Sequence, residues 1–268
     1  MVGGSLFIKL VKQLLPLKWK KQLEETGDIG RFTIRFFREF WRRPYEFREV
    51  VRQCFLLGYK SFPLVGITTF IIGLVLTIQS RPTLERFGAE AWLPAMVGIS
   101  IIREIGPVLT ALICAGKIGS SIGAELGSMK VTEQLDAMEV SGTNPFKYIV
   151  VTRIIATTFM LPVLVVTGDA IALYGSYLGV NIGDTVSFKL FYQQVFESLE
   201  YADALPAFVK SFFFGFAIGL VGCYKGYHSQ KGTEGVGRSA NSAVVVSSLL
   251  IFIIDLIAVQ IADFLGIT

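Results

Sequence analysis

The 268-residue sequence has little charge and few of the residues that build metal or disulfide sites. Charged residues make up 17% of the chain, whereas a soluble domain carries roughly a quarter. The three cysteines have no paired spacing and His228 is the only histidine, so neither a disulfide framework nor a Cys/His metal site is expected. No cofactor is expected either, and a net charge of +4 is too small to indicate nucleic-acid binding.

The sequence also lacks the phosphate-binding loop G-x-x-x-x-G-K-[ST]. The dipeptide Gly116-Lys117 is followed by isoleucine, and the leading glycine of the motif is missing. That loop holds nucleotide phosphates with its backbone N–H groups and its lysine. The chain is therefore not expected to hydrolyse ATP by this route.

Hydrophobic residues, in contrast, make up 52% of the chain, and the mean hydropathy is +0.58. They gather in long runs after residue 60, and a run of about 18 apolar residues crosses a bilayer as a helix. We predict an all-α integral membrane protein with about five transmembrane helices. The predicted spans are Phe62–Gln79, Trp92–Cys114, Tyr148–Leu178, Phe208–Tyr224 and Ala243–Ala262.

The distribution of lysine and arginine predicts the orientation. Residues 1–60, 117–153 and 225–238 hold 13, 4 and 3 of these residues. The opposite side holds only Arg81, Arg86, Lys189 and Lys210. Because positive residues favour the cytoplasmic side, the N-terminus is predicted to be cytoplasmic.

The first 60 residues are predicted to form a cytoplasmic or interfacial region, with a transmembrane domain over 61–268. Residues 31–43 alternate aromatic and basic side chains, a pattern typical of a helix lying in the membrane interface; RNA binding is the less favoured alternative. Ser5–Lys21 is predicted as a second surface helix. Between 181 and 207, apolar side chains at near-helical spacing predict a short amphipathic helix, with a plain loop as the alternative.

The stretch from Arg103 to Pro145 changes character along its length. Gly119, Gly123 and Gly127 share one helix face, so they allow close packing either within the chain or against a second copy. Polarity then rises, with a partly apolar face, until Ser141–Pro145 ends the pattern. This part is predicted to be a cytoplasmic surface helix that contacts a soluble partner.

Several motifs resemble the MlaE/YrbE permeases, the membrane subunits of ABC-type phospholipid transporters. The similar segments are 103–112 (REIGPVLTAL), 124–138 (AELGSMKVTEQLDAM), 225–227 (KGY), 235–238 (GVGR) and 241–245 (NSAVV). The likeness extends roughly over residues 35–265, and residues 1–30 match no pattern of the family.

The resemblance implies a homodimer in the inner membrane of bacteria with a double envelope, or in an equivalent plastid membrane. Two copies of a cytoplasmic ABC ATPase would bind the surface helices, and some systems include a STAS-domain protein. A ring of periplasmic MCE-domain subunits would sit on the outer face. The expected role is a permease subunit, not an enzyme, that moves phospholipid to maintain outer-membrane lipid asymmetry.

The predicted ATPase-coupling residues are acidic or amide side chains of the surface helix: Glu125, Glu133, Gln134 and Asp136. Closure of the ATP-bound ATPase would push this helix and shift the spans between two arrangements. The alternative is an acidic helix that merely faces solvent.

Charged side chains inside spans are costly and need partners or water. A polar network that supports a lipid cavity between two protomers is predicted from Arg103, Glu104, Asp203, Lys210 and Asp255. Structural ion pairing without lipid contact is the alternative. Candidates to line the cavity, by position and by resemblance, are Leu76, Gln79, Leu84 and Phe87. Arg81 and Arg86 attract lipid phosphate or face water.

Three other classes of protein fit less well. A secondary transporter is expected to show inverted repeats, and none is found. An intramembrane enzyme needs a nucleophile paired with a base, and a structural anchor does not need Arg103 and Glu104 inside a span. Uptake of sterols or other hydrophobic compounds stays open as an alternative cargo.

Overall fold

The computed structural model describes residues 17–43, 45–183 and 186–266, and these residues contain helices and connecting turns but no strand. Five helical stretches among them are long and apolar enough to cross a membrane. They are Phe47–Arg86, Glu90–Val131, Phe146–Val180, Tyr201–Tyr227 and Thr233–Phe264. The prediction of an all-α membrane protein with five spans is confirmed.

The chain divides into two compact units, Met1–Tyr45 and Glu46–Thr268. The first contains helix α2 (Leu17–Phe40), which covers most of the predicted aromatic and basic helix. Of the predicted surface helix Ser5–Lys21, residues 5–16 lie outside the described residues, and the rest forms the start of α2. The interfacial location of this unit stays a prediction.

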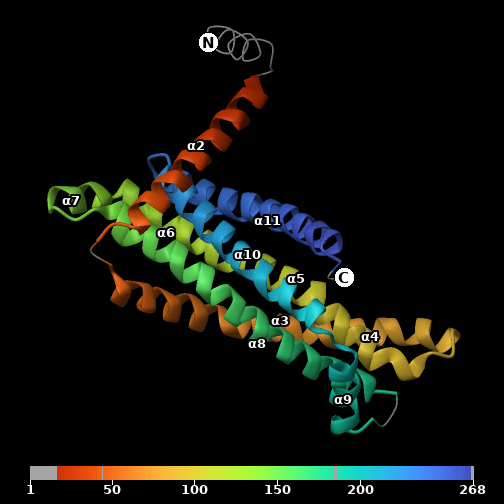
Figure 1. The fold of residues 1–268 in the computed structure, drawn as a ribbon. Coiled ribbons are helices and arrows are strands. Elements are labelled where there is room, and N and C mark those ends of the chain that lie inside the picture. Colours follow the sequence, from red (N-terminus) through yellow and green to blue (C-terminus); the bar gives the residue numbers. More distant parts are fainter. Residues whose placement is uncertain (1–16, 44, 184–185, 267–268) are drawn as a thin grey trace. The chain divides into compact units, whose positions relative to one another are not determined.

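The second unit contains the remaining helices (Figure 1). Their bounds are α3 Phe47–Arg86, α4 Leu93–Ser100, α5 Gly106–Cys114, α6 Ser120–Val131, α7 Gln134–Val140, α8 Thr152–Val180, α9 Phe188–Ser198, α10 Tyr201–Tyr227 and α11 Thr233–Phe264. Short π-helical turns at Ile101–Ile105 and Ala115–Gly119 join α4, α5 and α6 into one long stretch, and a third, Phe146–Val151, precedes α8.

The helices extend beyond the predicted spans. Helix α3 begins at Phe47, although its span was predicted from Phe62, and the second stretch continues past Cys114 to Val131. A run of apolar residues marks only the part of a helix that lies in the hydrocarbon layer. The helix itself can continue into segments with polar side chains. Residues 47–60 are therefore the first turns of the first spanning helix.

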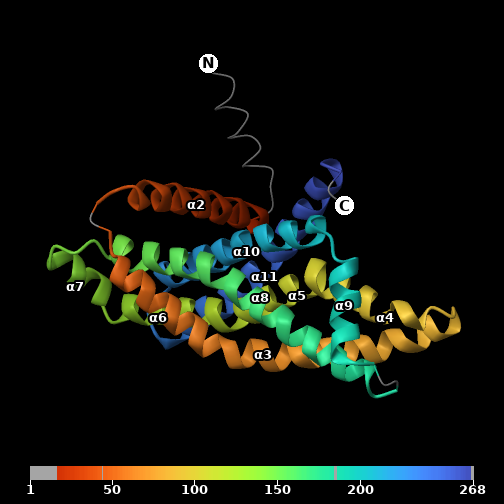
Figure 2. The same cartoon turned by 60° about the horizontal axis from the view of Figure 1, so that its bottom comes forward.

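Helices α3 and α8 lie side by side in both views (Figures 1 and 2), and small residues bring their backbones together. A Cβ atom on Gly73 would lie 1.9 Å from the carbonyl oxygen of Ala172. The Ser176 hydroxyl donates a hydrogen bond to the Gly73 carbonyl at 3.1 Å. Only glycine allows such a close approach, so this contact fixes how the first and third spans pack.

The glycine stripe of the second stretch faces other helices of the same chain. A Cβ atom on Gly123 would lie 3.3 Å from both the Cα atom of Ala240 and the Cβ atom of Ala243 on α11. Gly119 approaches side chains of α10 and α11, and Gly127 approaches Ser229 and Val236. Close packing within the chain accounts for these positions.

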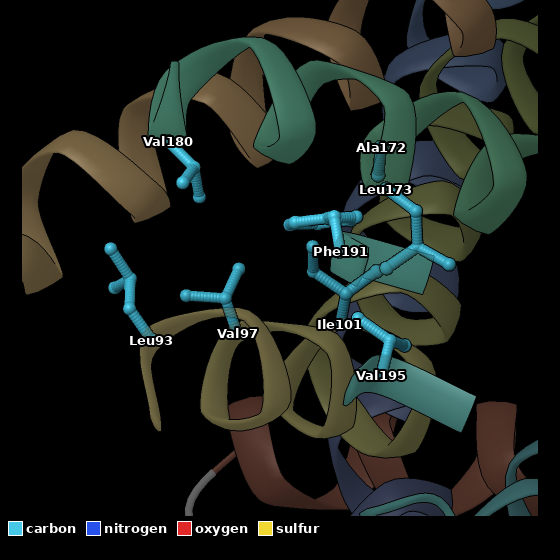
Figure 3. Packing of buried hydrophobic residues seen from close by; sticks show 8 residues of the cluster. All are labelled: Leu93, Val97, Ile101, Ala172, Leu173, Val180, Phe191 and Val195. Atoms are coloured by element: carbon cyan, nitrogen blue, oxygen red, sulfur yellow. The ribbon is translucent and has the colours of Figure 1, made fainter. Parts of the chain in front are cut away.

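A hydrophobic cluster joins α4, α8 and α9 at one end of the unit (Figure 3). The short helix expected between residues 181 and 207 is present as α9, and the Ser187 hydroxyl accepts a hydrogen bond from the Leu190 backbone at its start. The buried members of the hydrophobic cluster are Leu93, Val97, Ile101, Ala172, Leu173, Val180, Phe191 and Val195. Because Ile101 begins a π-helical turn, the cluster fixes the position of the charged residues that follow it.

Candidate functional site

Lys210 of α10 lies at the centre of the charged residues predicted within the spans. Its side chain is 3% exposed, and its Nζ atom donates to Glu104 Oε2 at 2.6 Å and to Asp255 Oδ1 at 2.9 Å. Glu104 lies in the π-helical turn and Asp255 in α11. One buried cation thus links three separate elements.

A second ion pair lies on the same side of α10. Arg103 contacts Asp203 Oδ1 at 3.4 Å, and Asp203 Oδ2 accepts a hydrogen bond from the Glu200 backbone at 3.1 Å, which caps α10. Asp203 and Lys210 are seven residues apart, so they share one face of α10. The sequence neighbours Arg103 and Glu104 therefore both pair with the same helix.

The five predicted residues are thus gathered, but as two sets. We call them together the Lys210 cluster: Arg103, Glu104, Asp203, Lys210 and Asp255. Within the described part of the chain, no hydrogen bond or ion pair joins the Arg103–Asp203 set to the Lys210 set. Arg103, Glu104, Asp203 and Lys210 line one small cavity of about 20 Å³, whereas Asp255 does not.

Local sequence explains the irregular turn that carries Arg103 and Glu104. Pro107 follows at the start of α5 and has no N–H to donate to the carbonyl of Arg103, four residues earlier. π-Helical turns occur where the regular ladder of hydrogen bonds is interrupted. The interruption coincides with the two charged residues.

The Lys210 cluster is not fully enclosed by its own chain. The side chains of Arg103 and Glu104 are 37% and 38% exposed, although both lie in a stretch long enough to span a membrane. Hydrocarbon cannot solvate these charges. A cavity of about 20 Å³ has room for roughly one water molecule, so a lipid headgroup needs additional surface.

The predicted lining residues do not join the cluster within one chain. Leu76 and Leu84 are partly buried against the hydrophobic cluster of Figure 3. Gln79 is exposed, and Phe87 is 80% exposed. None of the four lines the cavity beside Lys210, so their contact with lipid stays a prediction. Arg81 donates a hydrogen bond to the Val180 carbonyl at the end of α8.

The predicted surface helix is two helices rather than one. Helix α6 ends at Val131 and α7 begins at Gln134, with Glu133 in a left-handed conformation at φ 57° between them. The left-handed residue turns the chain and interrupts the helix. Glu133, Gln134 and Asp136 are exposed, whereas Leu135 is 1% exposed and anchors α7.

Glu125, the fourth predicted coupling residue, pairs with a buried arginine. Its Oε1 atom accepts a hydrogen bond from Arg153 of α8 at 2.7 Å. Sequence reasoning treated Arg153 only as one of the inner positive residues. The available signal was its position inside the predicted span Tyr148–Leu178, where a charge needs a partner.

Asp169 of α8 is a further acidic residue in the spans. Its Oδ1 atom is buried and has no hydrogen-bond partner among the described residues. It lies so close to Gly106 that a Cβ atom there would be 1.8 Å from it. Asp169 also lines an apolar cavity of about 510 Å³ between α8, α9 and α10.

The comparisons with known proteins all match permeases. A model of the family described as permease MlaE matches residues 50–261. A probable ABC transporter permease of Rickettsia bellii is 41% identical over 238 residues, which cover 87% of this chain and 92% of the relative. The intermembrane phospholipid transport system permease protein MlaE of Haemophilus influenzae is 32% identical over 245 residues, 85% and 94% of the two chains. A probable ABC transporter permease of a Synechocystis species is 35% identical over 206 residues, 77% and 78% of the two chains.

Proposed function

This chain belongs to the MlaE permease family, and from that membership we propose that it is the membrane subunit of an ATP-driven phospholipid transporter. It would exchange lipid between the bacterial inner membrane and a periplasmic MCE-domain partner and so maintain outer-membrane lipid asymmetry. The name of the Haemophilus relative supports phospholipid as cargo. A separate ATPase would supply the energy.

The observation that carries this proposal is the partly open Lys210 cluster. Its charges are paired, yet the side chains of Arg103 and Glu104 are more than a third exposed within a spanning stretch. A homodimer would cover them. In the most apolar part of α11, which carries Asp255, only 17% is buried, against 67% in that of the stretch Phe146–Val180. Two copies meeting at this face would enclose a cavity with charged groups beside apolar walls, as a phospholipid requires.

Helix α7 is the proposed contact for the ATPase. Glu133, Gln134 and Asp136 are exposed on the side where the positive residues predict the cytoplasm. Glu125 is bonded to α8 through Arg153, so a push on α6 and α7 would reach the third span directly. A STAS-domain protein would act by binding the ATPase.

A transport assay tests the role of the cluster. The chain would be reconstituted with its ATPase and MCE partners in liposomes, and transfer of a fluorescent phospholipid measured. Glu104→Gln keeps the side-chain shape but removes the charge beside Lys210, and we expect transport to fall by at least about tenfold, the equivalent of one charged hydrogen bond. Glu90→Gln, an exposed glutamate outside the cluster, is the matched control. Full transport by Glu104→Gln would refute the role of the cluster.

Binding of the ATPase is tested separately by co-purification. Glu133→Lys is expected to reduce recovery of the ATPase, whereas Glu234→Lys, an exposed residue on the same predicted side, is expected to leave it unchanged. Equal recovery with both variants would remove Glu133 from the contact.

The cargo is tested by mass spectrometry of lipids that co-purify with the complex. We expect phospholipid. We expect it to be lost with Phe87→Arg, because Phe87 is predicted to line the lipid cavity and the substitution places a charge there. Phe87 is exposed, so the substitution leaves the core intact. A bound sterol or other hydrophobic compound instead would keep the permease role and replace the cargo.

A further inference from the structure

A second charged site lies at the opposite end of the spanning bundle from the Lys210 cluster. It is a cavity of about 460 Å³ between the first turns of α3, helices α6 and α7, the turn Phe146–Val151 and the start of α8. We call it the Arg153 cavity. Its polar lining consists of Glu49, Arg52, Gln53, Lys60, Ser121, Glu125, Tyr148 and Arg153.

The carboxylates of the Arg153 cavity are already paired. Glu49 accepts a hydrogen bond from Gln53 at 2.8 Å and lies 3.4 Å from Arg52. Glu125 accepts from Arg153 at 2.7 Å. The acidic groups are therefore engaged by their neighbours and do not define a cation site.

Several donors, in contrast, have no partner. The Arg153 side chain is 5% exposed, and its Nε atom is buried without a hydrogen bond in the described part of the chain. A buried donor left unpaired costs about 1–3 kcal/mol, so a ligand oxygen that reaches Nε through a shift of the Arg153 side chain gains binding energy. For residues 17–43, 45–183 and 186–266, no side-chain hydrogen bond or ion pair is found at Lys60, Ser121 or Tyr148 either. The surplus of donors and of positive charge fits an anion.

The rest of the lining of the cavity is apolar. Leu56, Leu57, Met129, Met138 and Ile149 line it beside the donors. Lys60 comes two residues before the apolar run that begins at Phe62, so the cavity lies where the hydrocarbon layer gives way to headgroups. Basic pockets between spanning helices at this level bind anionic lipid headgroups.

We propose that the Arg153 cavity binds the phosphate group of a phospholipid from the leaflet on the side of the N-terminus, with the lipid's apolar part against the leucine and methionine side chains that line the cavity. This leaflet is the cytoplasmic one if the proposed orientation holds. Ser121, Glu125 and Met129 belong to α6 and Met138 to α7. Lipid in this leaflet would therefore contact the segment that is proposed to bind the ATPase. A phospholipid fits better than an acidic protein segment because the donors lie among apolar side chains at headgroup level.

Native mass spectrometry of the purified full chain in detergent, titrated with phosphatidylglycerol, tests this site. Arg153→Lys keeps the positive charge but removes the Nε donor, and Lys60→Gln removes an exposed charge. Each is expected to raise the apparent Kd about fivefold, the effect of one hydrogen bond. Ser121→Phe fills the cavity from an exposed position and is expected to remove one retained lipid. Lys231→Gln, an exposed lysine outside the cavity, is the matched control and is expected to bind like the unaltered chain.

Competitors identify the source of the phosphate. Inorganic phosphate is expected to displace phosphatidylglycerol only at far higher concentration, and diacylglycerol, which lacks the phosphate, is expected not to compete. Phosphate that binds as tightly as the lipid would overturn the lipid assignment, and so would an acidic peptide that occupies the cavity when the lipid does not. Unchanged affinity with both Lys60→Gln and Ser121→Phe would overturn the site. Glu104→Gln is expected to lose transport but keep this binding, so the two proposals fail independently.

Discussion

Charged side chains gather at two levels of the bundle, and the two sites leave very different amounts of space. In the Lys210 cluster each charged group has a partner and the cavity is about 20 Å³. In the Arg153 cavity, about 460 Å³ remains and donors are left without partners. Within one chain, the same residue types are therefore fully paired in one place and leave room for a ligand in the other. Substitutions that unpair the charges test this difference.

The largest effect is expected from Lys210→Met. The variant leaves the carboxylates of Glu104 and Asp255 close together with no cation between them. The Lys210 side chain is only 3% exposed, so the lost charge lies in the interior. Removing one partner of a buried ion pair destabilises a protein by about 3–5 kcal/mol. We expect a clear drop in the thermal unfolding temperature in detergent and loss of phospholipid transport.

The triple variant Lys210→Met, Glu104→Gln, Asp255→Asn separates stability from function. Replacing every charge of a buried pair by well-packed hydrophobic residues is often close to neutral. The variant likewise leaves no buried charge unpaired, although its two amides are polar, so part of the lost stability is expected to return. Transport is expected to stay low, because the field and the hydrogen bonds at the proposed cavity are gone. Recovery of transport together with stability would reduce the cluster to a structural role.

A smaller loss is expected from Arg153→Met. This change also removes a buried cation, but the remaining carboxylate of Glu125 is 56% exposed and can be hydrated. We expect destabilisation of about 1–2 kcal/mol, mainly from lost hydrogen bonds, measured by the same thermal unfolding. A loss equal to that of Lys210→Met would mean that the Arg153 cavity is as closed as the cluster.

The sequence predicted the membership of the Lys210 cluster because of the cost of charge in hydrocarbon. Arg103, Glu104, Lys210 and Asp255 interrupt apolar runs, and such residues must turn toward one another or toward water. Five spans followed from the same runs. These predictions use the composition of one helix at a time, and a single sequence is enough to read that composition.

Features that depend on how helices pack could not be predicted in this way. The pair of Glu125 and Arg153 requires that α6 and α8 lie side by side. The apolar sequences of these helices do not show which of their residues face each other. Leu76, a predicted lining residue of the lipid cavity, packs partly against the hydrophobic cluster. The sequence does not show this contact, because core-facing and lipid-facing positions have the same apolar composition in a membrane. The left-handed position between α6 and α7 is occupied by Glu133 rather than by glycine. The sequence therefore gives no signal for the break between these helices.

An effect of about 1 kcal/mol is expected from Arg103→Gln. Its partner Asp203 keeps a second role, because Oδ2 still accepts the hydrogen bond from the Glu200 backbone that caps α10. The Arg103 side chain is also 37% exposed, so the loss is that of one ordinary hydrogen bond. A double-mutant cycle with Asp203→Asn measures the coupling, and a value near zero would show that the pair does not hold the π-helical turn against α10.

The smallest effect is expected from Lys130→Ala. Lys130 Nζ lies 3.2 Å from Asp136 Oδ1, and the side chains are 40% and 59% exposed. Exposed pairs contribute about 0–1 kcal/mol and weaken further with salt, although this pair joins α6 to α7 across the break at Glu133. The unfolding temperature should therefore stay within error of the unaltered chain at moderate salt. If Lys130→Ala destabilises the chain as much as Arg103→Gln, the pair fixes the angle between α6 and α7. Burial would then not be what separates strong from weak charged contacts in this protein.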